Sequence, residues 1–189
     1  MSLNSLLVHI KKKVFQFRLK MADPHKRAEL MRNKFYYLGH NVKLYTIFFG
    51  NEPCLISIHD NVQVASGVKF INHDVSVYNM ARYKGVSEKK VDKVGPIVLY
   101  ENSFVGAYSI LMPNSSVGKN SVVAAGSIVT KHIPDGEVWG GAPCKYIMKT
   151  EEYANKIITE SNKFPWVEKR SEMSEKEVIN AWQDYFFKE

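Results

Sequence analysis

The sequence predicts a mainly β protein in which a triangular coil of short parallel strands carries α-helices at both ends. Three observations predict this fold class. Aliphatic residues recur every six positions in the middle of the chain, serines recur in the same rhythm, and apolar residues follow helical spacing at both ends. The 189 residues are enough for one domain with helical additions. No apolar run approaches the roughly 20 residues that a membrane span needs.

Residues 1–37 are predicted to form an N-terminal helical segment. Apolar residues at Leu7, Ile10, Val14 and Phe17 are spaced by three or four, with lysines between them. A packed amphipathic helix is one interpretation, and weak peripheral attachment to an acidic membrane surface is the other. Asp23-Pro24 fits an N-cap followed by proline at the first helical position, and this second helix is expected to continue to Gly39.

Residues 38–149 carry the six-residue repeat. A period of six fits neither a 3.6-residue helix nor a two-residue strand alternation, but it fits a coil whose turns each take three hexapeptides. Small residues are expected where the backbone bends inside a narrow core. The repeated aliphatic positions are Leu99, Val105, Leu111, Val117, Val123 and Val129. The repeated serines are Ser103, Ser109, Ser115, Ser121 and Ser127.

The repeat also includes Ile58, Val64 and Phe70, and it breaks at about residues 74–95. We expect the break to be a loop ejected from the coil, because long loops in compact domains are usually functional or disordered.

Residues 150–189 are expected to form a helical extension. Ser174-Glu175-Lys176-Glu177 matches a capping box, and the helix that it begins is expected to bury Val178, Trp182 and Phe186.

The chain is basic, with 26 Lys and Arg against 19 Asp and Glu, a net charge of +7. This balance favours anionic partners, but no nucleic-acid-binding motif accompanies it, so we expect no nucleic-acid partner. The two cysteines, Cys54 and Cys144, are interpreted as small buried hydrophobes. They form no CxxC pair, which favours a reducing, cytoplasmic location.

At this point the chain resembles the hexapeptide-repeat acyltransferases, over about residues 38–149. The matching segments are Ile58-His59-Asp60-Asn61-Val62, Val105-Gly106-Ala107, Val117-Gly118-Lys119-Asn120-Ser121, Ala124-Ala125-Gly126-Ser127-Ile128-Val129-Thr130-Lys131 and Val138-Trp139-Gly140-Gly141-Ala142-Pro143-Cys144-Lys145. The resemblance implies a left-handed parallel β-helix, homotrimers with active sites between neighbouring coils, and acetyl-CoA as the acyl donor. Phe70-Ile71-Asn72-His73-Asp74 is similar to the branch of galactoside, maltose and capsular-polysaccharide O-acetyltransferases, which implies a saccharide acceptor.

His73 is the candidate general base, because an unperturbed imidazole has a pKa of about 6.5, near working pH. The resemblance implies that it deprotonates the acceptor hydroxyl directly. Glu52 is expected to orient His73 or to bind a sugar hydroxyl, with a structural turn as the alternative. Asn72 and Asp74 flank the histidine and are predicted to contact the acceptor, with a loop cap as the alternative for Asp74.

The resemblance also implies residues that hold the donor. The backbone N–H of Ala107 is expected to serve the oxyanion, and Phe104 to line the thiol end of the donor. Ala125 matches a position whose backbone contacts the pantetheine arm. The positions expected near the nucleotide end are Thr130, Lys131 and Lys145.

Two other functions remain open at this point. A histidine base also serves an amine, so N-acetylation of an amino sugar or xenobiotic is one alternative, and a non-catalytic assembly subunit is another. A zinc enzyme of the same fold would need three histidines. No two of the six histidines are five residues apart and no third ligand is evident, so we expect no metal site.

Overall fold

The structure is a computed structural model that describes residues 3–188. It divides into two compact units, Met1–Thr150 and Glu151–Glu189. Residues 1 and 2 of the predicted N-terminal segment and residue 189 of the predicted C-terminal extension lie outside the described residues.

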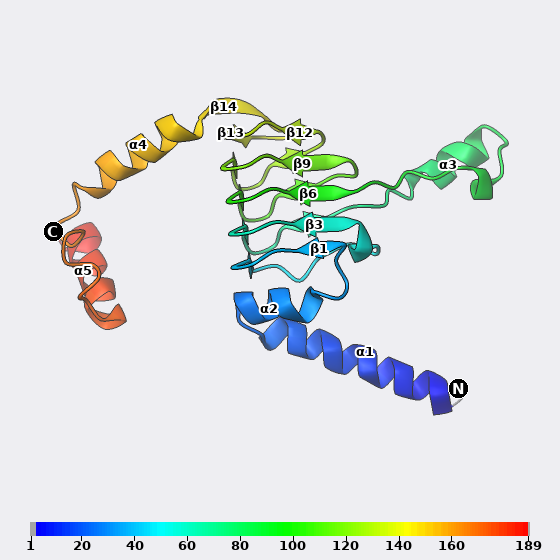
Figure 1. The fold of residues 1–189 in the computed structure, drawn as a ribbon, viewed down its shortest axis with the longest axis horizontal. Coiled ribbons are helices and arrows are strands. Elements are labelled where there is room, and N and C mark those ends of the chain that lie inside the picture. Colours follow the sequence, from blue (N-terminus) through cyan, green and yellow to red (C-terminus); the bar gives the residue numbers. More distant parts are fainter. Residues whose placement is uncertain (1–2, 189) are drawn as a thin grey trace. The chain divides into compact units, whose positions relative to one another are not determined.

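The first unit is a coil with three parallel sheets as its faces (Figure 1). The first sheet consists of β1 (Tyr37–Leu38), β3 (Ile56–Ile58), β6 (Ile97–Leu99), β9 (Ser115–Val117) and β12 (His132–Ile133). The second consists of β2 (Lys43–Leu44), β4 (Gln63–Val64), β7 (Phe104–Val105), β10 (Val122–Val123) and β13 (Glu137–Gly140), with β14 (Lys145–Lys149) antiparallel to β13. The third consists of β5 (Lys69–Phe70), β8 (Ile110–Leu111) and β11 (Ile128–Val129).

The chain visits the three sheets in rotation, which is the winding that the repeat predicts. Leu99 pairs with Val117, and Val105 pairs with Val123, so one turn of the coil takes eighteen residues, or three hexapeptides. All six repeated aliphatic side chains are completely buried. The mainly parallel β architecture with helices at both ends is therefore confirmed.

The repeated serines are buried as well, and the hydroxyls of Ser109, Ser121 and Ser127 donate to backbone carbonyls where the chain turns. Ser121 Oγ donates to the carbonyl of Pro134 at 2.7 Å, and Ser127 Oγ donates to the carbonyl of Ala124 at 2.6 Å. A larger side chain at these positions would displace the core, and an apolar one would leave the carbonyl without that bond.

Asparagines occupy one corner of the coil in the left-handed backbone conformation. Asn61, Asn102 and Asn120 have φ of 59°, 55° and 56°. Asparagine tolerates this region better than other residues with a Cβ. The side chain of Asn102 donates to Asn120 Oδ1 at 2.8 Å, so successive turns are also linked on the outside of the coil.

Two helices precede the coil, α1 (Leu3–Met21) and α2 (Pro24–Met31). Asp23 caps α2 by accepting from the Lys26 N–H at 3.0 Å, which confirms the predicted N-cap. The expected continuation to Gly39 is wrong, because α2 ends at Met31. Leu38 belongs instead to strand β1, where it pairs with Ile58 of β3 and is buried in the core. An apolar residue at this position suits a strand as well as a helix.

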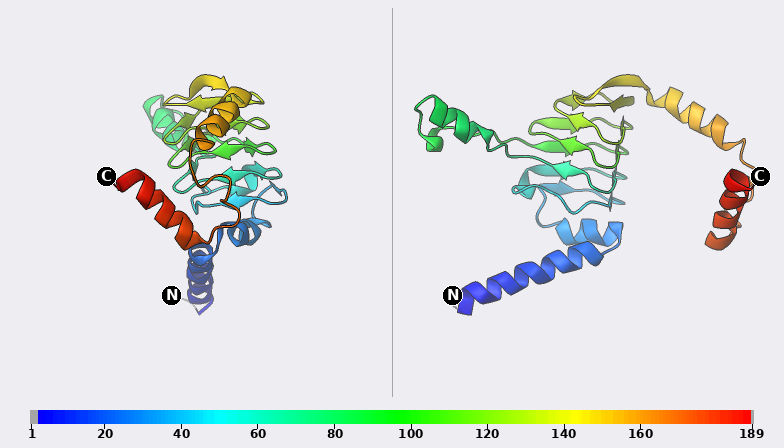
Figure 2. Two further views of the ribbon diagram at one scale, coloured as in Figure 1. Left: turned by 90° about the vertical axis from the view of Figure 1, so that its left-hand side faces the viewer. Right: turned by 180° about the vertical axis from the view of Figure 1, so that it is seen from behind.

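A segment of the first unit leaves the coil between β5 and β6 (Figures 1 and 2). It holds α3 (Ser76–Tyr83) and the 3₁₀ turn η2 (Glu88–Lys90). At its neck, His73 and Val94 form a single antiparallel bridge. The Asp74 N–H donates to the carbonyl of Lys93 at 2.8 Å, and the Gly95 N–H donates to the carbonyl of Asn72 at 3.0 Å.

The second unit holds most of α4 (Thr150–Ser161) and all of α5 (Glu175–Phe187). The capping box at Ser174 and Glu177 is confirmed. Val178 is buried as predicted, but Trp182 and Phe186 are 43% and 56% exposed, so their predicted burial is wrong. The short unit offers α5 too little surface to cover its whole apolar face.

The two cysteines differ in burial. Cys144 is buried, and burial raises the pKa of its thiol. Cys54 is exposed, because it lies in the short 3₁₀ turn η1 (Pro53–Leu55) outside the core, so its predicted burial is wrong.

Candidate active site

His73 lies where the chain leaves the third sheet. Phe70 is the last buried residue of β5, and the bridge between His73 and Val94 draws the chain into the neck of the ejected loop. The imidazole is thereby fixed at the base of the loop, at the carboxyl end of β5. Its side chain is 19% exposed, so it is sheltered but reachable.

Glu52 reaches the same place from the turn before β3. Its Oε1 lies 3.0 Å from His73 Nδ1, although the two residues are 21 positions apart. The other ring nitrogen, Nε2, lies 3.2 Å from the Tyr78 hydroxyl and 3.1 Å from Asp92 Oδ1. The hydrogen bond to Glu52, with the added negative charge of Asp92 and Asp74, raises the pKa of His73 above its ordinary value.

Both ring nitrogens face a carboxylate, and a carboxylate accepts only. The Glu52 side chain is 31% exposed and the Asp92 side chain 60%, so water screens Asp92 more, which favours the neutral tautomer whose hydrogen is on Nδ1 and bonds Glu52. The lone pair is then on Nε2, and the ring can take a proton from a group placed there. The Tyr78 hydroxyl is able to donate to this lone pair.

Asn72 is buried beneath the pair, with 1% of its surface exposed. Its side-chain amide donates to the backbone carbonyl of Glu52 and holds the turn in place. A Cβ added at Gly50, where φ is 69°, would lie 2.5 Å from Asn72 Oδ1, so the turn needs glycine there. Two buried oxygens, Asn72 Oδ1 and Glu52 Oε2, have no hydrogen-bond partner among residues 3–188.

Asp74 closes the neck of the loop. Its Oδ2 accepts from Lys93 Nζ at 2.7 Å, and its Oδ1 accepts from the Ser76 N–H at 3.0 Å. The hydrogen bond from Lys93, helped by those from Ser76, lowers the pKa of Asp74 to about 2. The carboxylate therefore links the two chain segments that enter and leave the loop.

The sequence reasoning missed three residues of this cluster, Tyr78, Asp92 and Lys93. All lie in the ejected loop, where no repeat indicates which side chains meet. The one usable signal was the position of the neck. The residues at which the chain leaves the coil must lie beside the residues at which it returns.

The predicted donor-binding alanines lie at the other end of the third sheet. Ala107 and Ala125 precede β8 and β11 and occupy the same corner on successive turns, where the Gly126 N–H donates to the carbonyl of Ala107 at 2.8 Å. The backbone N–H groups of Ala107 and Ala125 have no hydrogen-bond partner in the described part of the chain. Two free donors therefore lie one above the other.

The other predicted donor residues are spread over the coil. Phe104 lies on β7 and is exposed. Thr130 and Lys131 follow β11, at the same end of the third sheet as His73, and Lys131 Nζ lies 5.2 Å from the ring centroid of Trp139. Lys145 begins β14 and is exposed. One chain thus unites His73 with Glu52, Asn72 and Asp74, but keeps them apart from Ala107 and Ala125.

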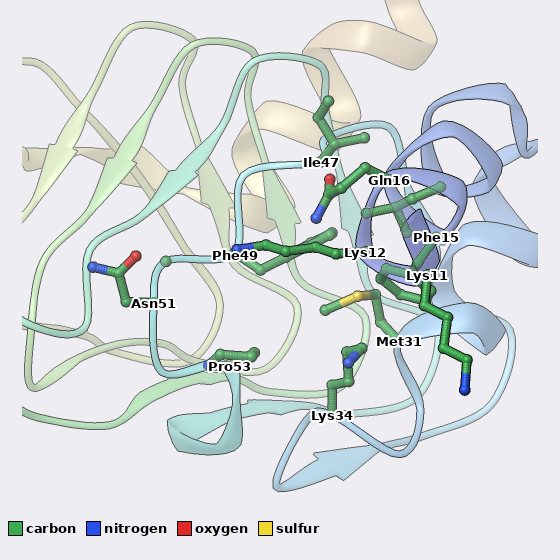
Figure 3. A pocket seen from close by; sticks show the side chains of 12 residues that line it. Lys11, Lys12, Phe15, Gln16, Met31, Lys34, Ile47, Phe49, Asn51 and Pro53 are labelled. Carbon is green, nitrogen blue, oxygen red and sulfur yellow. The ribbon is translucent and has the colours of Figure 1, made fainter. Parts of the chain in front are cut away.

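A cavity of about 680 Å³ lies between α1, the end of α2 and the first turns of the coil (Figure 3). Its apolar wall includes Phe15 and Phe49, and Lys11, Lys12 and Lys34 also line it. Asn51 and Pro53, the neighbours of Glu52 in the chain, belong to the lining too. The turn that carries Glu52 therefore separates this cavity from the histidine.

Within residues 3–188, no group of three or more His, Cys, Asp or Glu side chains is arranged to hold a metal ion. In the same range, no helix has the length and apolar character that crossing a bilayer requires.

Comparisons with known proteins give several relatives. The chain is 34% identical over 110 residues to Protein CapG of Staphylococcus aureus, covering 58% of this chain and 62% of CapG. It is 29% identical over 124 residues to the galactoside O-acetyltransferase of Escherichia coli strain K12, covering 62% of this chain and 59% of that enzyme. The chain therefore spans less than two thirds of the length of these two relatives.

A third relative is covered more fully. Putative acetyltransferase SAV2555 of Staphylococcus aureus strain Mu50 is 30% identical over 154 residues, which cover 70% of this chain and 74% of that protein. No protein-family model matches the chain.

Solved structures share the fold. A maltose O-acetyltransferase from Clostridium difficile 630 superposes with a TM-score of 0.54 and 22% identity, covering 72% of this chain and 83% of that one. A galactoside acetyltransferase in complex with coenzyme A gives a TM-score of 0.53 and 22% identity, covering 82% and 86%. With the six-residue coil and the sequence relatives, these likenesses lead to one conclusion: the chain belongs to the hexapeptide-repeat acetyltransferase family, in the branch that contains CapG and galactoside O-acetyltransferase.

Proposed function

We propose that this protein transfers an acetyl group from acetyl-CoA to a hydroxyl group of a saccharide, with His73 as general base. The observation that carries the proposal is the contact between Glu52 and His73 Nδ1, which favours the ring tautomer that has its lone pair on Nε2. The names of the relatives, a galactoside O-acetyltransferase among them, support the saccharide as acceptor.

In this mechanism Nε2 accepts the proton of the acceptor hydroxyl as its oxygen bonds the carbonyl carbon of the thioester. The carbon–sulfur bond breaks, and the proton on Nε2 passes to the departing thiolate, so the histidine ends the cycle neutral. The Glu52 carboxylate stabilises the imidazolium that forms between these two transfers. No acyl group becomes attached to the protein.

The free N–H of Ala107 is the proposed donor to the thioester oxygen, where negative charge develops. The free N–H of Ala125, one turn away, is the proposed contact for the pantetheine arm. Phe104 is proposed to line the thiol end, and Thr130, Lys131 and Lys145 to bind the phosphate-bearing end, where basic side chains suit the anionic groups.

We further propose that the coil is left-handed and that the working molecule is a homotrimer. His73 and Ala107 belong to opposite ends of the third sheet. A cleft between two coils would bring the histidine of one chain to the free N–H groups of the next.

Asn72 and Asp74, which flank His73 in the chain, are assigned different roles. Asp74 remains a proposed contact for acceptor hydroxyls, in addition to closing the loop neck. For Asn72 we propose a positioning role, because its side chain is buried and its amide holds Glu52. Cys54 and Cys144 are both unpaired, which is in keeping with the proposed cytoplasmic location.

The test is thiol release from acetyl-CoA with a panel of saccharides, followed by identification of the acetylated product. His73→Ala should lower turnover by at least about a hundredfold, since a positioned general base contributes about 10²–10⁴-fold. His25→Ala is the matched control, because His25 is exposed on α2, away from the cluster, and its loss should leave turnover unchanged.

Circular dichroism should show that both variants fold. A loss of less than about tenfold in His73→Ala would remove the histidine from the mechanism. Acetylation of amino groups alone would reassign the acceptor, and no thiol release with any acceptor would overturn the enzymatic function.

A further inference from the structure

Helix α1 presents an apolar stripe that no other part of residues 3–150 covers. Its members follow one another at steps of three, four, three and four residues, so they share one face of the helix. They are 47–68% exposed. The stripe consists of Leu7, Ile10, Val14, Phe17 and Met21. The opposite face already has a partner, because Leu19 is buried in the coil core and Phe15 packs against it.

The orientation of the stripe is fixed by Arg27 of α2. Its guanidinium donates to the carbonyls of Leu19 at 2.8 Å and Ala22 at 2.7 Å, at the end of α1. It also donates to the carbonyl of Leu44 in β2 at 2.6 Å. Figures 1 and 2 show α1 beyond α2 at the end of the coil where β1 lies. The stripe is therefore held away from the core.

Basic residues border the stripe on both edges. At 100° per residue, Lys13 and Lys20 lie along one edge and Lys11 and Arg18 along the other. All four are exposed, and α1 contains no acidic residue. In the described part of the chain, none of the four forms an ion pair. The face thus has an apolar centre, and the positive charge along its two edges is not neutralised by acidic side chains.

We infer that α1 lies on the surface of an anionic membrane, with the stripe inserted among the acyl chains and the basic edges at the lipid phosphates. Long basic side chains reach the headgroups while their stems cover apolar surface. The spacing alone would also suit a helix of a second copy. Such pairing would place basic edges against basic edges, which repel each other, whereas anionic lipid neutralises both.

The experiment is flotation of the full chain with lipid vesicles, and its readout is independent of acetyl transfer. Vesicles of phosphatidylcholine alone are compared with vesicles containing about one third phosphatidylglycerol, which supply the anionic surface. We expect binding to the anionic vesicles only. Raising the salt concentration should weaken binding by at least about tenfold, because exposed charges are screened.

Two pairs of variants localise the contact. Val14→Asp with Phe17→Asp should abolish flotation, while the matched control Ile158→Asp with Ile179→Asp, two exposed apolar residues of the second unit, should float like the unmodified chain. Lys13→Gln with Lys20→Gln should weaken binding by about tenfold or more, and the Arg versions of the same two positions should retain it.

All of these positions are exposed, so folding and thiol release with a water-soluble saccharide should be unchanged. Equal binding to neutral vesicles, or equal loss in the control pair, would overturn the inference. Failure of the unmodified chain to float on anionic vesicles would also overturn it. If Val14→Asp with Phe17→Asp then changed the oligomeric state measured by light scattering, the stripe would be assigned to a second copy.

Discussion

Replacing Glu52 with glutamine tests the proposed role of this carboxylate, which is to hold the hydrogen of the His73 ring on Nδ1. The change keeps the shape of the side chain but removes the negative charge that lies 3.0 Å from His73 Nδ1. Because the hydrogen bond to Glu52 is the largest cause of the raised pKa of His73, that pKa should fall in the variant. The proposed base is active when neutral, so the acidic limb of kcat/KM against pH should move to lower pH.

The rate on the plateau should fall as well. In the proposed mechanism the charge of Glu52 holds the hydrogen on Nδ1 against the pull of Asp92, which lies 3.1 Å from Nε2, and in the variant that charge is gone while Asp92 remains. A ring with its hydrogen on Nε2 has no lone pair for the acceptor. We expect a loss of about ten- to hundredfold in kcat, less than in His73→Ala, because a general base is worth about 10²–10⁴-fold and the imidazole is still present.

The assay is thiol release from acetyl-CoA across pH, with Asp92→Asn introduced into the Glu52→Gln background. Removing the competing carboxylate should recover part of the lost kcat, because it no longer draws the hydrogen to Nε2. Asp92→Asn alone, the control, should change kcat little. An unchanged acidic limb together with unchanged kcat in Glu52→Gln would refute the role assigned to Glu52.

Two further predictions concern stability and the loop neck. Leu99→Ala removes a completely buried side chain from the core of the coil. It should lower the free energy of unfolding, measured by urea denaturation, by about 2–5 kcal/mol. A change below about 1 kcal/mol would contradict a close-packed core. Lys93→Met should raise the pKa of Asp74 from about 2 toward 3.8, followed by NMR titration of the carboxyl carbon. Since the folded pKa is depressed, the stabilisation by this pair is present above pH 3.8 and is lost as the pH falls toward 2. A variant in which Asp74 still titrates near 2 would show that Lys93 is not the cause.

The coil could be predicted from the sequence because its repeat is local. Each buried aliphatic residue, such as Val105, meets its counterpart Val123 one turn later, and the period that aligns them is visible in the chain itself. The end of α2 could not be predicted in the same way. The apolar spacing around Leu38 fits a helix and a strand equally well, and only the pairing with Ile58 decides between them.

The candidate site was predictable to the extent that it borders the repeat. His73 stands three residues after Phe70, the last repeat position before the break. Glu52 stands six positions before Ile58, where the repeat would place an aliphatic residue. Their separation of 3.0 Å depends on a full turn of the coil, and no local pattern encodes it. Tyr78 and Asp92 lie in the loop, where tertiary contacts alone decide which side chains reach the ring.

The antiparallel strand β14 has a consequence for how copies of this chain can associate. A stack of parallel rungs has an open hydrogen-bonding edge at each end, and an open edge invites another chain to continue the ladder into a fibre. Here β14 folds back along β13, pairing from Gly140 to Glu137, and occupies that edge in the second sheet, while α2 packs on β2 at the far end. Neither end of this sheet therefore offers an open edge, so the second sheet cannot be continued by a strand of another copy.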